Sequence, residues 1–236
     1  MYGYGYDYSY MIGYGFVILA FIITMGAQLL VKGRYSKYKK INCEEDISGY
    51  EVARKILDAN GLGTVDIVET QGELTDHYDP SRKVVRLSSD IYHGTSIASV
   101  AVSAHECGHA IQDKEGYTFL RIRSALVPTV NLCSKLGYIV IFIGLAAGFF
   151  NLAMFGLILL GAILLFQLVT LPVEFDASKR GKEQIRKLNL VSSSSQDGVK
   201  SMLTAAALTY VAAVASTLLN LLRLLLMILG GRRNRR

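Results

Sequence analysis

From Leu136 to Val173 the chain has 38 consecutive residues without one charged side chain. Because an α-helix rises about 1.5 Å per residue, two crossings of a hydrocarbon core of about 30 Å need roughly 40 residues. The run therefore predicts a membrane-spanning helical hairpin with its turn near residues 148–151. We expect Pro172, near the end of the run, to end the second helix. The composition agrees, because 51% of the residues are hydrophobic and 19% are charged, which also excludes a disordered chain.

Two further uncharged runs are long enough to cross a membrane. Met11–Val31 has 21 such residues. We expect it to be a retained first span and not a cleaved signal peptide, because residues 1–10 carry no Lys or Arg and no small-residue cleavage site follows. Ser201–Leu222 has 22 uncharged residues and is followed by Arg223, a short apolar stretch and a basic tail. This last block predicts either a fourth span or a helix in the membrane interface.

The distribution of basic residues predicts which side of the membrane each segment faces. Lys and Arg collect on the cytoplasmic side of membrane proteins. The segment from Lys32 to Arg123 carries 13 of them, the segment from Glu174 to Lys200 carries six, and the hairpin turn carries none. Both basic segments are therefore expected in the cytoplasm, with the N-terminus outside. A complete fourth crossing would place the arginines of the tail outside, against the charge rule, whereas an interfacial last helix would not.

The net charge of +6 follows from this topology and does not point to a nucleic-acid partner. The basic cluster Lys32–Lys40 comes directly after a span, so we expect it to contact the anionic headgroups of the lipid bilayer. The three cysteines, Cys43, Cys107 and Cys133, are odd in number and form no CxxC pair, which argues against a disulfide framework.

The segment after the first span has the pattern of a small α+β domain. Residues 48–60 carry apolar side chains at helical spacing, with Ser48 and Glu51 placed to form a capping box. Further along, alternating apolar residues and turn signals predict two strands and then a long helix. These elements are expected at residues 64–69, at residues 83–88, and from Thr95 or Ser96 to beyond His109.

The most informative motif is His105-Glu106-Cys107-Gly108-His109, an HExxH sequence within the expected long helix. Positions four residues apart lie on one helix face, so both imidazoles can reach one ion. Zn²⁺ accepts histidine nitrogen and, in catalytic sites, takes three protein ligands and a water molecule. Glu106 is placed to deprotonate such a water, whereas Cys107 points away from the histidine pair and is expected in the core. The alternative is a core helix whose histidines bond to the backbone.

A zinc site would need a third protein ligand. The only other histidines are His77 and His93. Glu174 is the stronger candidate, because it follows Pro172 at the expected cytoplasmic end of the hairpin, which folds back towards the motif. Asp176 is its competitor, either as a ligand or as an acceptor for a histidine N–H.

Four stretches carry a more specific signal than the motif alone: LTDHYDP (74–80), LSSDIYHG (87–94), AHECGHAIQ (104–112) and LPVEFDAS (171–178). Together they resemble the YugP-like neutral zinc metallopeptidases, an integral-membrane family. The order of an HExxH helix, a transmembrane hairpin and a glutamate-bearing helix is also similar to that of HtpX-type membrane gluzincins. The resemblance implies that His105, His109 and Glu174 bind zinc and that Glu106 is the general base. One departure is Ser178, where the HtpX-like pattern has aspartate, so the carboxylate that supports a ligand could be Asp176 or Asp90.

The resemblance implies an α+β membrane protein that is mostly helical, with transmembrane helices and a small zincin-like catalytic domain containing a short sheet. The expected segments are an extracytoplasmic arm (1–10), a first transmembrane helix (11–31), a cytoplasmic catalytic domain (32–124), a transmembrane hairpin (125–173), a cytoplasmic segment with the third ligand (174–200), a transmembrane or interfacial helix (201–229) and a basic tail (230–236).

The implied function is zinc-dependent hydrolysis of peptide bonds in membrane proteins or peptides at the cytoplasmic membrane surface. Glu106 would activate the water, and the oxyanion of the reaction would need a further donor, for which Tyr92, His93 and His77 are candidates. The strand at residues 83–88 could pair with an extended substrate by main-chain addition.

Two other classes of function would each need a feature of their own. A membrane scaffold or chaperone with a structural zinc site would need a fourth protein ligand, such as His77, because structural sites leave no open position. A transporter would need polar or ionisable residues inside its spans, and the hairpin offers only Asn151 and Gln167. The sequence therefore favours the peptidase.

Overall fold

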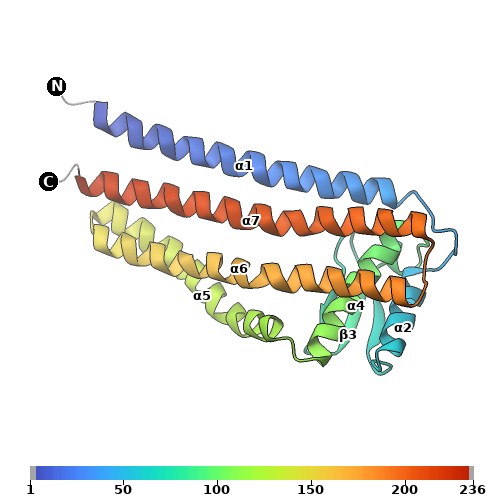
Figure 1. Cartoon of the computed structure of the whole chain (residues 1–236). Helices are drawn as coiled ribbons and strands as arrows, with labels where there is room; N and C mark the ends of the chain where they lie inside the picture. Colours follow the sequence, from blue (N-terminus) through green and yellow to red (C-terminus); the bar gives the residue numbers. More distant parts are fainter. Residues whose placement is uncertain (1–3, 234–236) are drawn as a thin grey trace. The chain divides into compact units, whose positions relative to one another are not determined.

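The computed structural model describes the backbone of residues 4–233 and the side chains of residues 11–232. Four of its helices, α1, α5, α6 and α7, are long and apolar enough to cross a membrane. The other elements include a small three-stranded sheet, so the prediction of an α+β membrane protein is confirmed. In chain order the elements are α1 (Tyr4–Tyr38), α2 (Gly49–Ala59), β1 (Asp66–Thr70), β2 (His77–Asp79), β3 (Val84–Ser88), α3 (Ser89–Tyr92), α4 (Ile97–Lys114), α5 (Thr118–Ala147), α6 (Phe150–Lys187) and α7 (Ser193–Arg233) (Figure 1).

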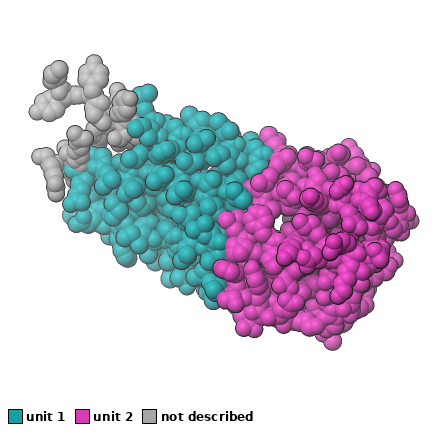
Figure 2. Space-filling model, viewed as in Figure 1, with its two compact units in different colours: residues 1–27, 122–170, 209–236 teal, residues 28–121, 171–208 magenta. Residues whose placement is uncertain are grey.

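The chain divides into two compact units (Figure 2). Unit 1 comprises residues 1–27, 122–170 and 209–236, and it contains the apolar parts of the four long helices. Unit 2 comprises residues 28–121 and 171–208, and it contains the sheet, α2, α3, α4 and the charged ends of α1, α6 and α7. The HExxH motif and Glu174 both belong to unit 2.

Within unit 1, α5 and α6 form the expected hairpin. The turn lies between Ala147 and Phe150, where Gly148 adopts a positive φ of 73° that glycine reaches without strain. Small residues let the two helices approach closely, because a Cβ added to Gly156 would lie 2.8 Å from the carbonyl oxygen of Gly137.

The prediction that Pro172 ends the second helix of the hairpin is wrong. Helix α6 runs without interruption from Phe150 to Lys187, with Pro172 inside it. Proline removes one backbone N–H from the helix, but long membrane helices tolerate this where local adjustments or neighbouring groups satisfy the freed carbonyl. Glu174 is therefore held within a continuous helix and does not follow a helix end.

The two ends of the chain also differ from expectation. Helix α1 begins at Tyr4, so it extends into residues 1–10, which were expected to form an arm; residues 1–3 lie outside the described part. Helix α7 is one helix from Ser193 to Arg233, longer than the expected segment 201–229. Its length and composition suit a complete crossing.

The sheet of unit 2 has the strand order β1-β3-β2, with β1 parallel and β2 antiparallel to β3. The two expected strands correspond to β1 and β3, whereas β2 was not predicted. It has three residues, His77–Asp79, too few to show an alternating pattern. The Asp79 carboxylate ends this strand by accepting a hydrogen bond from the backbone N–H of Ser81 at 2.9 Å.

Helices α2 and α4 pack with the sheet around one buried core. The capping box predicted for α2 is confirmed, with Ser48 and Glu51 bonded to each other's backbone N–H groups. Ser96 caps α4, so the second of the two proposed starts of this helix is the observed one. Cys107 is fully buried with its Sγ atom 3.6 Å from the carbonyl oxygen of Ala53, which confirms that it belongs to the core.

A close crossing brings the second half of α6 against α4. A Cβ added to Gly108 would lie 2.3 Å from the carbonyl oxygen of Ala177, and one added to Gly181 would lie 2.6 Å from that of Ala104. Such distances are far below van der Waals contact, so only glycine allows the two backbones to approach this closely. The crossing places the HExxH residues opposite Glu174.

Candidate metal centre

Three side chains from the crossing of α4 and α6 converge on one point. The Nε2 atom of His105 lies 3.3 Å from Oε2 of Glu174, and the Nε2 atom of His109 lies 3.6 Å from the same oxygen. One nitrogen or oxygen atom from each of the three residues lies within 4.8 Å of the others. Glu174 and His109 are buried, and His105 is partly buried.

The spacing and chemistry of these atoms fit a zinc ion. Ligands bound to zinc at about 2.0–2.1 Å in tetrahedral geometry lie about 3.3–3.4 Å from one another. The two His–Glu separations are 3.3 and 3.6 Å, close to that edge length. Two imidazoles and a carboxylate are also a ligand set of catalytic zinc sites. Among the described residues no other His, Cys, Asp or Glu joins the cluster, so a tetrahedral ion would keep one open position.

The second nitrogen of each imidazole has its own partner, as expected for metal-binding histidines. Nδ1 of His105 lies 3.1 Å from the hydroxyl of Ser178, which is one helical turn after Glu174 on α6. Ser178, which stands where the HtpX-like pattern has aspartate, therefore still contacts a histidine of the motif. Asp90 is not that partner, because the Nδ1 atoms of His105 and His109 face Ser178 and Gln112. The Asp90 carboxylate accepts a hydrogen bond from Lys39 at 2.5 Å.

A chain of polar contacts supports the other histidine. Nδ1 of His109 lies 3.0 Å from Oε1 of Gln112, a fully buried residue on the same helix. The Gln112 amide group donates to the carbonyl oxygen of Val173 and to Asp176, both at 2.8 Å. Asp176 also accepts from the guanidinium of Arg180 at 2.5 Å. Asp176 therefore lies outside the His–His–Glu cluster and supports His109 through Gln112.

We expect replacement of Gln112 by methionine to weaken metal binding by about 10–100-fold, because His109 would lose the partner that fixes its orientation. Methionine has a similar volume, so the core should remain filled. The measurement is zinc affinity by competition with a chelator. The control is Gln184→Met, since Gln184 is a partly buried residue on α6 that contacts Asn60 and not the cluster. Unchanged affinity in the Gln112 variant would contradict this role.

Glu106 lies between the two histidines in sequence and is buried. Burial raises the pKa of its carboxyl group to about 7, and the nearby carboxylates of Glu174 and Asp76 add to the rise. His105 and a hydrogen bond from the backbone of Tyr78 act in the opposite direction. A divalent cation held beside this group would partly reverse the rise in its pKa. The surroundings of Glu106 are thus those of a carboxyl group able to exchange a proton near neutral pH.

The structure does not bring Tyr92 and His93 into the cluster. The ring of Tyr92 stacks at 5.0 Å on Tyr50 of α2. The Nε2 atom of His93 lies 3.3 Å from Oε2 of Glu69. Glu69 belongs to β1, which is the edge strand on the other side of the sheet from β2. His77 is exposed, and its Nδ1 atom lies 2.8 Å from the carbonyl oxygen of Thr75. Among the described residues, no interaction joins these three side chains to His105, His109 or Glu174.

The expectation that the strand at residues 83–88 pairs with a substrate is wrong. This strand, β3, is central and is already paired on both sides. An extended chain could add only to an edge strand, β1 or β2. Tyr78 of β2 reaches Glu106 through its backbone, so β2 is the edge nearer to the cluster.

Sequence reasoning missed three residues of the site: Gln112, Ser178 and Tyr78. Gln112 lies three residues after His109, on the same helix face, and that spacing was a usable signal. Ser178 lies four residues after Glu174, but a serine there gives no sign of contact with a histidine on another helix. Tyr78 contacts Glu106 through its backbone, so its residue type could not indicate this role.

Fold and site together define an α+β membrane protein in which two helices supply a His–His–Glu set able to hold a metal ion. A family model described as "Putative neutral zinc metallopeptidase" matches residues 13–229, and the chain belongs to this family. It is similar to the protein named "Putative membrane protease YugP" of Bacillus subtilis (strain 168). The two are 44% identical over 215 residues, which cover 91% of this chain and 96% of that protein. No solved structure matches the chain.

Proposed function

We propose that this protein is a zinc-dependent endopeptidase of the membrane, with His105, His109 and Glu174 as its zinc ligands. The observation that carries this proposal is the convergence of both Nε2 atoms on one carboxylate oxygen, at 3.3 and 3.6 Å. The membership of a zinc metallopeptidase family and the similarity to a protein named as a membrane protease support it.

The main alternative, a scaffold or chaperone with a structural zinc ion, is less consistent with the geometry. Structural zinc sites are closed by four protein ligands. The cluster has three members among the described residues, and His77, the expected fourth ligand in that case, contacts the backbone of Thr75. An open position beside a buried carboxyl group is the arrangement that hydrolysis needs.

Zinc held by these residues would polarise the scissile carbonyl and lower the pKa of a water molecule. Glu106 would accept the proton of that water and later donate it to the leaving amine. Burial raises the pKa of this carboxyl group and a bound cation would lower it, so the group could both take up and release the proton. Ser178 and Gln112 would hold the two imidazoles in the tautomer that presents Nε2 to the ion.

The substrate is proposed to be a membrane protein or a peptide at the cytoplasmic membrane surface. The charge pattern supports this side, because the segments that carry the motif and Glu174 hold 13 and six basic residues. The cluster also lies on the part of α6 that directly continues its apolar run, so the reaction would take place near the bilayer surface.

The test is cleavage of casein and of a detergent-solubilised membrane protein by the purified full-length chain, before and after zinc removal. We expect cleavage to be lost on chelation and restored by one equivalent of zinc. Cleavage that persists in a preparation shown to contain no metal would contradict the proposal.

A further inference from the structure

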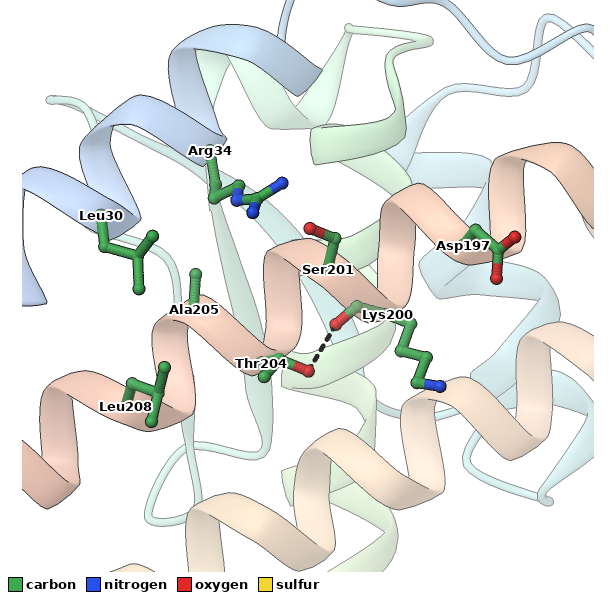
Figure 3. A pocket seen from close by; sticks show the side chains of 8 residues that line it. All are labelled: Leu30, Arg34, Asp197, Lys200, Ser201, Thr204, Ala205 and Leu208. Carbon is green, nitrogen blue, oxygen red and sulfur yellow. Dashed lines mark hydrogen bonds between the residues drawn. The ribbon is translucent and has the colours of Figure 1, made fainter.

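A pocket separate from the metal cluster lies between α1 and α7 (Figure 3). Its volume is about 310 Å³. Leu30 and Arg34 come from α1, and the remaining lining residues come from the first turns of α7. Figure 3 shows the two leucines, Leu30 and Leu208, at one end and Asp197 at the other. The pocket is thus apolar at one end and charged at the other.

This change of polarity coincides with the ends of two membrane-spanning runs. The uncharged run of α1 ends at Val31, so Leu30 belongs to it and Arg34 follows it. The uncharged run of α7 begins at Ser201, so Lys200 precedes it and Leu208 lies within it. Both helices therefore pass from charged to apolar residues inside one pocket, which is the level where lipid headgroups meet acyl chains.

The positive charges of the pocket are not neutralised by an acidic partner. No carboxylate of the described residues forms an ion pair with Arg34 or Lys200. Arg34 and Ser201 both form a hydrogen bond with the hydroxyl of Tyr38, which holds these two side chains at the pocket. Asp197 is the one acidic side chain of the lining, so the pocket carries two basic groups against one acidic group.

A second groove, between α6 and the first turns of α7, adjoins this pocket. Lys200 and Asp197 line both, and the second adds three basic residues from α6 against one glutamate. Its basic residues are Lys179, Lys182, Arg186 and Lys200. The whole charged region would attract a negatively charged ligand from the bilayer surface.

We propose that the pocket between α1 and α7 binds one anionic phospholipid of the bilayer. Arg34 and Lys200 contact its phosphate, and Leu30 and Leu208 contact the first methylene groups of an acyl chain. The Thr204 hydroxyl donates to the carbonyl oxygen of Lys200 at 2.7 Å, so it can only accept a hydrogen bond from the headgroup. The volume suits a headgroup and the start of one chain, while the remaining chain stays in the bilayer. The proposal does not depend on the peptidase activity.

The experiment counts phospholipid bound to the full-length protein in detergent by native mass spectrometry, with phosphatidylglycerol and phosphatidylcholine added separately. We expect one phosphatidylglycerol to bind in preference to phosphatidylcholine. The double variant Arg34→Gln/Lys200→Gln should weaken this binding by about fivefold for each lost charge. The charge-preserving variant Arg34→Lys/Lys200→Arg should retain it, which separates loss of charge from loss of folding.

The matched control is Lys55→Gln/Arg82→Gln, which removes the same two charges from exposed positions outside the pocket. An equal loss of lipid in this control would overturn the proposal, because attraction would then be a property of the whole surface. Leu30→Gln tests the apolar end and should weaken phosphatidylglycerol binding. Displacement of the lipid by an equal concentration of glycerol phosphate would show a site for free phosphates and would also overturn the proposal.

Discussion

Replacement of Glu106 by glutamine is expected to leave the zinc content unchanged and to lower peptide cleavage by about 10²–10⁴-fold. Glutamine keeps the size of the side chain but cannot accept the proton of the attacking water. The residue is buried beside His105 and accepts a hydrogen bond from the backbone of Tyr78, so an amide of the same shape should be accommodated by rotation of its end. The ligands themselves are untouched.

The measurement compares the rate of casein cleavage and the metal content per chain for wild type and variant. Glu183→Gln is the matched control, because Glu183 lies on α6 and, within the described part of the chain, its carboxylate pairs with the exposed Lys179 at 3.8 Å. This control should cleave as the wild type does. A Glu106→Gln protein that cleaves at the wild-type rate would show that Glu106 is not the base.

Replacement of Gly108 by valine is expected to abolish tight zinc binding and to destabilise the protein. A Cβ at this position would lie 2.3 Å from the carbonyl oxygen of Ala177. That carbonyl belongs to the backbone of α6, so the two helices would have to move apart. Overpacking of this kind costs typically about 1–3 kcal/mol and more where backbone must shift. Because Glu174 reaches the histidines from α6, separation of the helices would pull the ligand set apart.

The measurements are zinc affinity and the midpoint of thermal unfolding in detergent. Gly161→Val, on α6, is the control, since no atom lies within 4 Å of a Cβ added there. It should bind zinc with the affinity of the wild type. If Gly108→Val also does so, the close crossing of α4 and α6 is not what brings the ligands together.

The membrane-spanning elements and the motif could be predicted because their signals are local. A run of 38 uncharged residues is long enough to cross a membrane twice, whatever surrounds it. The HExxH spacing places two histidines on one face of any helix that contains it. The capping box of Ser48 and Glu51 is similarly contained within four consecutive residues. Each of these predictions needed no knowledge of what packs against the segment.

The rest of the site could not be predicted because it depends on how α6 crosses α4. Pro172 suggested a helix end, yet the helix continues, and this continuity places Ser178 one turn from Glu174 and opposite His105. Tyr92 and His93 were chosen for their residue types near the motif, whereas their contacts are with α2 and β1. Proximity along the chain was a poor guide to proximity in space for these residues.

The most direct test of the proposed centre is X-ray absorption at the zinc edge of the full-length protein loaded with one equivalent of zinc. We predict a four-coordinate ion with nitrogen and oxygen ligands at about 2.0–2.1 Å, the scattering pattern of two imidazoles, and no sulfur. Glu174→Ala should change this shell and weaken binding. A sulfur ligand at about 2.3 Å, or a spectrum unaltered by Glu174→Ala, would contradict a centre built from His105, His109 and Glu174.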